Sequence, residues 1–305
     1  MSALWLVAAL VSQVVFSFAD PAINESSGLV DLGATMVTTN DSGGDPLVFS
    51  VDPRTGETVG RTTFTDAVED VEALAPAGAG EVWVADIGDN AERRESVQVY
   101  RVPVGRGDTT VAAPSYELVY PDGARDAESL VASRNGRLYV IGKGLLGGTV
   151  YVAPRRLDPD APNVLRPVAA VDVWATDAAL FPDGRHVLVR GYDNAAVYTF
   201  PDFEPVGSFD LPPQDQGEGV SIGRSGRIRI SSEGAHSDVV QVELPGELRS
   251  ALEAEPPTPS AAPEPAVGTD DVAEVDDEHS KWLVVGGTLA ALVAIAVWVS
   301  RRRES

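Results

Sequence analysis

The chain has 305 residues, of which 44% are hydrophobic and 23% charged, and its formal net charge is −23. A surface this acidic repels nucleic acid, which excludes DNA and RNA as partners, and it suits divalent cations or cationic ligands. Because the chain contains no cysteine, disulfides and thiolate metal sites are excluded as well.

The N-terminal segment has the pattern of a secretory signal peptide. Residues 4–18 are apolar, and Ser17 and Ala19 place small residues at the two positions that a signal peptidase reads. We expect residues 1–19 to be removed, which makes Asp20 the first mature residue. Because no Lys or Arg precedes the apolar run, an uncleaved signal anchor is the alternative. In either case the middle of the chain is exported.

Residues 20–249 are predicted to form an all-β ectodomain. Short runs rich in β-branched and aromatic residues recur there, among them GEVWVAD, GRLYVIG, HVLVRG and VVQVEL, and Gly, Pro, Asp and Asn separate them. Alternating or fully apolar runs of this length are typical of strands, and no amphipathic helical stretch of useful length interrupts them.

One element recurs five times in this region, a polar cluster followed by a small residue and an aliphatic one. It reads ESSGL at Glu25, DVEAL at Asp70, DAESL at Asp126, TDAAL at Thr176 and QGEGV at Gln216. A strand follows each copy and ends in a second polar cluster, namely NDSGG, DIGDN, IGKG, GYDN and SSEG. A unit of 40 to 56 residues with four short strands predicts a β-propeller. We expect about five four-stranded blades, or six if a degenerate unit is hidden, and a Greek-key sandwich is the alternative.

These motifs resemble those of a family of secreted bacterial propellers. ESSGL, NDSGG and DIGDN carry the resemblance in the first half, and EGVSI followed by SSEG is similar to phytase-like, esterase-like propeller domains. The resemblance spans about residues 24–245. It implies a group that includes calcium-dependent phosphatases, lactonases and members with no assigned reaction. The chain departs from the pattern at Ala178, where an acid is expected, and it lacks a basic cluster suited to phosphate.

Acidic residues stand at matching positions of the repeat and are predicted to converge at one end of the axial channel. Glutamate is not a favoured turn residue, so turn formation does not explain Glu72, Glu128 and Glu218. Carboxylates forced together bind a cation or retain protons, and Ca²⁺ takes six to eight oxygen ligands. The candidate metal ligands are Asp70, Glu72, Asp86, Asp89, Asp126, Glu128, Glu218 and Glu233. The alternative is that the Asp, Asn and Gly residues form turns.

Further residues of the two clusters are candidates for binding a ligand. Asn40, Asn90 and Asn194 offer neutral oxygens, and Asp41 and Asp193 add carboxylates. Arg94, with Arg93 and Arg125, lies beside the acids, where it either neutralises them or holds an anion. Of the three histidines, only His236 has polar surroundings that suit a general base, and a loop role is the simpler interpretation; His186 follows a turn and His279 lies in the linker.

The C-terminal part predicts a membrane anchor on a spacer. Residues 250–280 are acidic and rich in Pro, which is typical of a disordered linker. Trp282 to Val299 is a continuous run of apolar and small residues, so we expect a transmembrane helix over residues 281–300. The arginines of the tail, residues 301–305, mark its cytoplasmic side. A buried core helix is the alternative.

Together these patterns predict a membrane-anchored extracytoplasmic propeller that binds a small ligand or an envelope protein, with calcium at its channel. The alternative is a metal-dependent hydrolase of phosphoesters or lactones, which rests on the resemblance and the carboxylates. The sequence contains no S-x-x-K motif to support a serine nucleophile. A structural scaffold for other envelope proteins is a third hypothesis.

Overall fold

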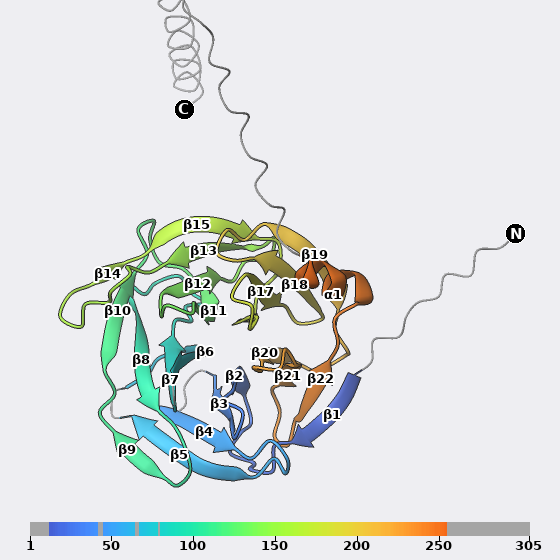
Figure 1. Ribbon diagram of the computed structural model, residues 1–305. Helices are drawn as coiled ribbons and strands as arrows, with labels where there is room; N and C mark the ends of the chain where they lie inside the picture. Colours follow the sequence, from blue (N-terminus) through green and yellow to red (C-terminus); the bar gives the residue numbers. More distant parts are fainter. Residues whose placement is uncertain (1–11, 42–44, 65–66, 79, 255–305) are drawn as a thin grey trace, which may run out of the picture. The chain divides into compact units, whose positions relative to one another are not determined.

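Four-stranded antiparallel sheets, repeated five times around a central axis, form the folded part of the chain (Figure 1). The computed structural model describes residues 12–41, 45–64, 67–78 and 80–254. In each sheet the first strand lies nearest the axis and the later strands follow outward (Figure 1). The fold is therefore a five-bladed β-propeller, as the repeat predicted, and not a sandwich. Within the described residues no sixth blade is present.

Blades 1 and 2 each gain a fifth strand from a later part of the chain. Blade 1 contains β2 (Ser26–Asp31), β3 (Met36–Asn40), β4 (Leu47–Val51), β5 (Thr58–Phe64) and β9 (Thr109–Val111). Blade 2 contains β6 (Val71–Gly78), β7 (Glu81–Asp86), β8 (Val97–Pro103), β10 (Ser115–Val119) and β14 (Asn163–Val164). Because β9 and β14 pair in parallel with β5 and β10, they cover two outer edges and tie neighbouring segments of the ring together.

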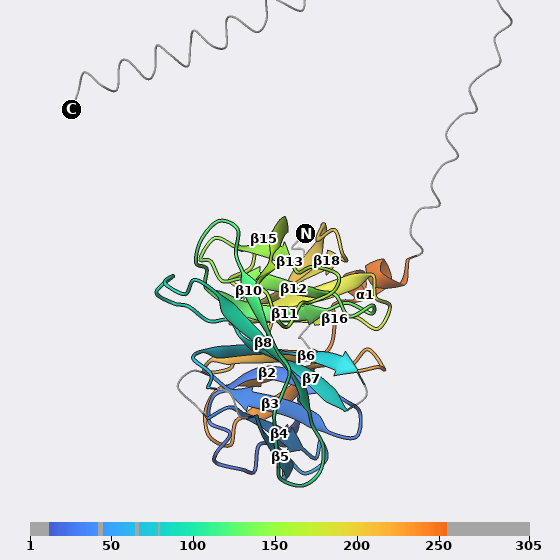
Figure 2. The same ribbon diagram turned by 90° about the vertical axis from the view of Figure 1, so that its left-hand side faces the viewer.

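The remaining blades have four strands each. Blade 3 contains β11 (Ala127–Ala132), β12 (Leu138–Gly142), β13 (Gly148–Val152) and β15 (Arg166–Val171). Blade 4 contains β16 (Asp177–Leu180), β17 (His186–Arg190), β18 (Asn194–Thr199) and β19 (Pro205–Asp210). Blade 5 contains β20 (Gly217–Ile222), β21 (Ile228–Ser232), β22 (Asp238–Val242) and β1 (Ser12–Ser17). Figure 2 views the ring from the side, with blade 2 toward the reader.

The outer strand of blade 5 comes from the N-terminus and closes the ring. β1 pairs antiparallel with β22, and the Phe18 side chain beside it is fully buried between blades 5 and 1. The backbone packs tightly here, since a Cβ on Gly56 would lie 1.9 Å from the Ser17 carbonyl oxygen. The folded unit thus includes residues that the sequence assigned to a signal peptide over 1–19. Cleavage after Ala19 stays a prediction, and it would remove β1.

One hydrophobic cluster fills each interface between neighbouring blades. The interface of blades 2 and 3, for example, buries Trp83 and Tyr151. The helix α1 (Gly246–Glu253) follows β22 and buries Leu248 in the cluster between blades 4 and 5, which extends the folded unit slightly beyond residue 249. Packing between sheets, rather than within one central core, therefore holds the ring together.

The small residue of the repeated motif permits inner strands to approach each other. Each inner strand contacts the next, and β20 contacts β2. A Cβ on Gly28 would lie 2.5 Å from the Leu74 amide nitrogen, and one on Gly219 would lie 3.0 Å from the Leu29 Cβ. Larger side chains at these positions would push the strands apart, which explains why the motif carries Gly, Ala or Ser there.

The described residues contain no helix with the length and apolar character that a membrane crossing requires. The expected transmembrane segment at 281–300, the tail at 301–305 and nearly all of the expected linker at 250–280 lie outside the described residues. Those parts of the predicted organisation stay predictions.

Candidate functional site

Seven carboxylates gather at the end of the channel where the inner strands begin. We call this end the acidic mouth, and it comprises Asp41, Asp70, Glu72, Asp126, Glu128, Glu218 and Glu233. Glu72, Glu128 and Glu218 are each the second residue of an inner strand, in blades 2, 3 and 5. All three are at least 96% buried, since their exposed fractions are 3%, 2% and 4%. The sequence prediction placed these three glutamates at equivalent positions, and the structure gives them equivalent places.

A β-bulge turns the inner glutamates toward the mouth. The pairing of β6 with β7 shifts register between Val71 and Ala73, so Glu72 is an extra residue in the ladder. The pairing of β11 with β12 shifts in the same way around Glu128, and β20 shifts between Gly217 and Val220. An extra residue re-aims its side chain without lengthening the partner strand.

Asp41, Asp70 and Glu72 form the tightest group at the mouth. Each offers one carboxylate oxygen, and these oxygens lie within 4.8 Å of one another. Asp70 Oδ1 is buried and has no hydrogen-bond partner within the part of the chain that the structure describes. Three carboxylates at this spacing match the hard oxygen ligands that Ca²⁺ requires.

Gly88, in the DIGDN motif, leaves room for this group. A Cβ on Gly88 would lie 2.4 Å from Asp70 Oδ2 and 2.6 Å from Glu72 Oε1. The absence of a side chain therefore lets two carboxylates rest directly on the backbone. The Ser27 hydroxyl holds the same strand in place by donating to the Glu72 carbonyl oxygen at 2.6 Å.

Glu128 is neutralised by Lys143, which follows β12. The Lys143 ammonium donates to Glu128 Oε1 and lies 5.6 Å from the ring centroid of Tyr192. Burial alone would lower the pKa of Lys143, but the charge of Glu128 and the hydrogen bonds to Glu128 and Tyr192 outweigh burial and raise it. Lys143 is therefore a fixed positive charge inside the acidic mouth. Behind it, the half-exposed Trp174 makes an edge contact with Tyr192 at 5.3 Å between ring centroids.

Gln216 joins the remaining two glutamates. Its amide donates to Glu233 Oε1 at 2.6 Å and more weakly to Glu218 Oε1 at 3.4 Å. Glu218 Oε2 is buried and has no hydrogen-bond partner among the described residues. A carboxylate that is ionised, buried and without a hydrogen-bond partner costs free energy. This oxygen is therefore favourable only when it carries a proton or contacts a cation.

Burial is the first cause of raised pKa values throughout the mouth. It raises the pKa of Glu218 to about 7, against the opposing charges of Lys143 and Arg190. Burial and the charge of Asp41 raise the pKa of Asp70 to about 6. The pKa values of Glu72 and Glu128 are raised in the same way, by burial and by the neighbouring carboxylates. The mouth therefore retains protons near neutral pH unless a cation replaces them.

Blade 4 departs from the other blades for a structural reason. Its inner strand pairs regularly, without a bulge, and Ala178 is buried between blades 3 and 4. Asp177 is fully buried and accepts the Ala178 and Val220 amides at 2.8 and 2.7 Å, and burial raises its pKa. Arg190, also fully buried, donates to the carbonyls of Gly219 and Ser231 at 2.6 and 2.7 Å. Blade 4 thus uses its charged residues to hold blade 5 and adds no acid to the mouth.

Three of the predicted metal ligands are held by protein donors. Asp86 accepts the Glu69 and Asp70 amides and the Arg94 guanidinium, the last at 2.7 Å. Asp89 accepts the Arg93 and Arg94 amides, and Asp126 accepts the Asp89 amide. These contacts favour the turn-forming interpretation of the DIGDN segment.

Three of the predicted ligand-binding residues, Asn40, Asn90 and Arg94, have structural partners or lie on the surface. Asn40 bonds to the Ala22 carbonyl and to the Asn24 and Glu25 amides, which fixes the loop that enters blade 1. Arg94 is engaged with Asp86 and the Gly88 carbonyl, and Asn90 is exposed.

The other residues considered from the sequence also have simpler roles. Arg125 bonds to Asp122, and Asp193 is an exposed turn residue. His186 pairs with Asp183 and His236 bonds to the Phe18 carbonyl, so each histidine contacts a turn or loop.

Sequence reasoning missed Lys143, Tyr192 and Gln216 at the mouth. One signal was available for Lys143, because the chain has only one other lysine, Lys281. From the sequence alone, the scarcity of lysine is most simply interpreted as compositional bias. The structure places the single lysine of the described residues inside the candidate site. Its ammonium is compact and its side chain flexible, whereas the arginines of the chain carry a planar guanidinium.

Comparisons with known proteins return structures but no sequence family. No family model matches the chain, and no curated protein matches it either. Similar solved structures include a PQQ-bound aldose sugar dehydrogenase from Streptomyces coelicolor, with a TM-score of 0.45 and 11% identity over 77% of this chain and 98% of that one. A gluconolactonase from Xanthomonas campestris has a TM-score of 0.44 and 16% identity over 78% and 81% of the two chains. The Dos1 propeller has a TM-score of 0.37 and 16% identity over 68% and 52%. The sheet topology described above establishes the propeller independently of these likenesses.

Proposed function

We propose that the chain is a membrane-anchored extracytoplasmic propeller that binds Ca²⁺ at its acidic mouth and holds a small ligand or an envelope protein there. The carrying observation is the convergence of Asp41, Asp70 and Glu72 at the mouth that also contains the buried Glu218. Asp70 and Glu218 each have one carboxylate oxygen without a partner within the described residues. The anchor is the expected helix at 281–300, which stays a prediction.

The chemistry of the donors favours calcium over a transition metal. The group offers carboxylate oxygens, and the described histidines bond elsewhere, to Asp183 and to the Phe18 carbonyl. Carboxylate sites of this kind suit Ca²⁺, whose coordination shell tolerates irregular geometry and added water. Cation binding would also compensate for the burial and the nearby negative charges that raise the pKa values of Asp70 and Glu218.

Calcium titration of the full-length protein tests the proposal. We expect one Ca²⁺ per chain by isothermal titration calorimetry at pH 8, a higher unfolding temperature with Ca²⁺, and loss of both effects with EGTA. Glu72→Gln is expected to weaken binding at least tenfold, since it removes a ligand charge. Glu204→Gln, an exposed residue of blade 4, is the matched control and should bind as the unmodified chain does. No change in stability with EGTA, and no metal in the purified protein, would refute the calcium site.

Protease accessibility tests the proposed location. Protease added to intact cells should digest the propeller while the C-terminal tail stays protected. A pull-down with the anchored form, performed with Ca²⁺ and with EGTA, then tests whether a partner binds the mouth. A partner retained equally in both conditions would bind elsewhere on the surface.

A second candidate function is metal-assisted hydrolysis of phosphoesters or lactones. The observation that favours it is the pKa of Glu218 at about 7, because a carboxyl near neutrality can accept and return a proton. A bound cation would polarise the substrate oxygen, and Lys143 would stabilise negative charge that develops nearby.

Substrate screens separate the two candidates. The full-length protein is tested with generic phosphoester and lactone substrates in the presence of Ca²⁺. Activity that disappears with Glu218→Gln at saturating Ca²⁺, while the variant stays folded and Glu204→Gln remains active, would establish the hydrolase. Calcium binding without turnover of any substrate would leave the binding function.

A further inference from the structure

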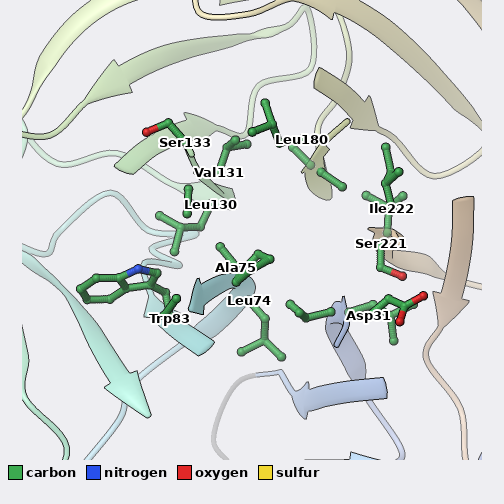
Figure 3. A pocket seen from close by; sticks show the side chains of 18 of the residues that line it. Asp31, Leu74, Ala75, Trp83, Leu130, Val131, Ser133, Leu180, Ser221 and Ile222 are labelled. Atoms are coloured by element: carbon green, nitrogen blue, oxygen red, sulfur yellow. The ribbon is translucent and has the colours of Figure 1, made fainter. Parts of the chain in front are cut away.

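A second cavity lies at the opposite end of the same channel, where the inner strands end. It has a volume of about 370 Å³ and takes lining residues from all five blades (Figure 3). The aliphatic residue of each repeated motif contributes to it, namely Leu29, Leu74, Leu130, Leu180 and Val220. Cavities of this size hold small organic ligands. It is distinct from the acidic mouth, whose three inner glutamates lie at the other ends of the strands.

Most of the cavity wall is apolar. Of its polar side chains, Asp31 and Ser133 have partners elsewhere, whereas the buried Ser221 hydroxyl has no hydrogen-bond partner among the described residues. Asp31 accepts the Arg229 guanidinium and the Gly33 amide, both at 2.7 Å. Ser133 bonds to Asn135 and to the Arg137 backbone. In Figure 3 the oxygen atoms of Asp31 and Ser133 point away from the centre of the cavity, while the aliphatic side chains of its wall surround the centre. An apolar group is therefore the favourable occupant.

The charge around this end is opposite to that of the acidic mouth. Nearby acids have partners, since Asp31 pairs with Arg229 and Asp183 contacts Arg185 and the His186 ring. Arg134 lines the cavity, and Arg224 lines an adjoining hollow that shares Asp31, Leu180 and Ile222 with it. Both arginines are exposed, and the described residues place no acidic partner in contact with either. In a chain of net charge −23, two such guanidinium groups mark this rim as the place where an anion is favoured.

We propose that this cavity binds a free medium-chain carboxylate, with its hydrocarbon body between the five inner strands and its carboxylate at Arg134 and Arg224. At about 30 Å³ for each water-sized group, the volume accommodates on the order of ten methylene groups. The apolar wall supplies affinity through burial, and the arginines select a negatively charged head over a neutral or positive one. The proposal is independent of the calcium site.

Photolabelling of the full-length protein tests this assignment. A decanoate analogue with a photoreactive diazirine at its apolar end is added, and labelled residues are mapped by mass spectrometry. We expect labels within 74–78, 130–134 and 178–182, and we expect decanoate to compete at least ten times more effectively than decylamine. The double variant Arg134→Gln/Arg224→Gln should lose that preference while keeping the fold. Arg166→Gln, an exposed arginine of β15, is the control with the same charge change and should retain the preference.

A cavity-filling variant provides the second arm. Leu180→Trp enlarges a side chain of the cavity wall and should abolish labelling, with thermal unfolding to verify that the chain folds. If that variant does not fold, the arginine variants still decide the outcome, because they change only exposed positions. Labels outside the cavity, equal competition by decylamine, or competition by phospholipid but not by decanoate would each overturn the proposal.

Discussion

Raising the pH from 5 to 8 without a divalent cation is expected to destabilise the propeller, and Ca²⁺ is expected to reverse the loss. Glu218 is the clearest contributor. Burial raises its pKa from 4.5 to about 7 in the folded chain. Between these values the folded state holds a proton that the unfolded state has released, so stability falls as pH rises through this window. Above pH 7 the loss from this residue is complete.

The magnitude follows from the difference between the two pKa values. Each pKa unit corresponds to about 1.4 kcal/mol, so Glu218 alone costs about 3 kcal/mol at pH 8. Glu72 and Glu128 act in the same direction, because burial raises their pKa values too. Asp70 is half-exposed, and solvent screening reduces its share. A loss of this size is a substantial part of the 5–15 kcal/mol that typically stabilises a domain.

Urea unfolding at pH 5 and pH 8, with and without millimolar Ca²⁺, measures the effect. Glu218→Gln cannot ionise, so this variant should be more stable than the unmodified chain at pH 8 in EGTA and should gain less from Ca²⁺. Glu204→Gln controls for the loss of one charge at an exposed position. If the unmodified chain and Glu218→Gln lose the same stability between pH 5 and pH 8, the glutamate is not held in the buried state described here.

Three further changes test individual parts of the fold and site. A chain that begins at Asp20 lacks β1 and two buried phenylalanines, which costs on the order of 3–6 kcal/mol; equal stability in urea would show that β1 does not close the ring. Lys143→Met leaves Glu128 without its cation, so calorimetry should detect a second bound Ca²⁺ or a tighter one, whereas Lys143→Arg keeps a positive charge beside Glu128 and should bind no additional Ca²⁺. Gly88→Ala displaces two carboxylates and should weaken Ca²⁺ binding about tenfold with little change in unfolding temperature; unchanged affinity would remove the glycine from the site.

The repeat was sufficient to predict the propeller because every blade needs the same local sequence features. Strand-length apolar runs, Gly-containing turns and a small residue at the inner strand recur with each unit, and each has a steric reason in the structure. Ring closure was not predictable in this way. The sequence of β1 has the apolar character of a signal peptide. Only its pairing with β22 shows that the segment is a strand of the folded unit.

The site was predicted in part, and the local backbone around each acid decides whether the prediction succeeded. The glutamates on bulges were identifiable, since Glu72, Glu128 and Glu218 share a position that turns do not explain. Asp86 and Asp89 have equally regular positions, but they bond to nearby amides, as short acidic side chains commonly do. Sequence spacing cannot distinguish these two outcomes, because it does not show which carboxylates find a local donor.

The same repeated motif makes one end of the channel acidic and the other end apolar. Glu72 and Leu74, Glu128 and Leu130, and Glu218 and Val220 are each two residues apart, which is about 6–7 Å along a strand. The acids therefore end at one mouth and the aliphatic side chains form a level beyond them. Because the inner strands pack rigidly at that level, we expect no coupling between the ends. Leu180→Trp should leave Ca²⁺ affinity unchanged, and Glu218→Gln should leave decanoate labelling unchanged. If either variant changed the affinity at the distant end, the ring would need a second conformation, and both ligands would have to bind the two conformations with different affinities.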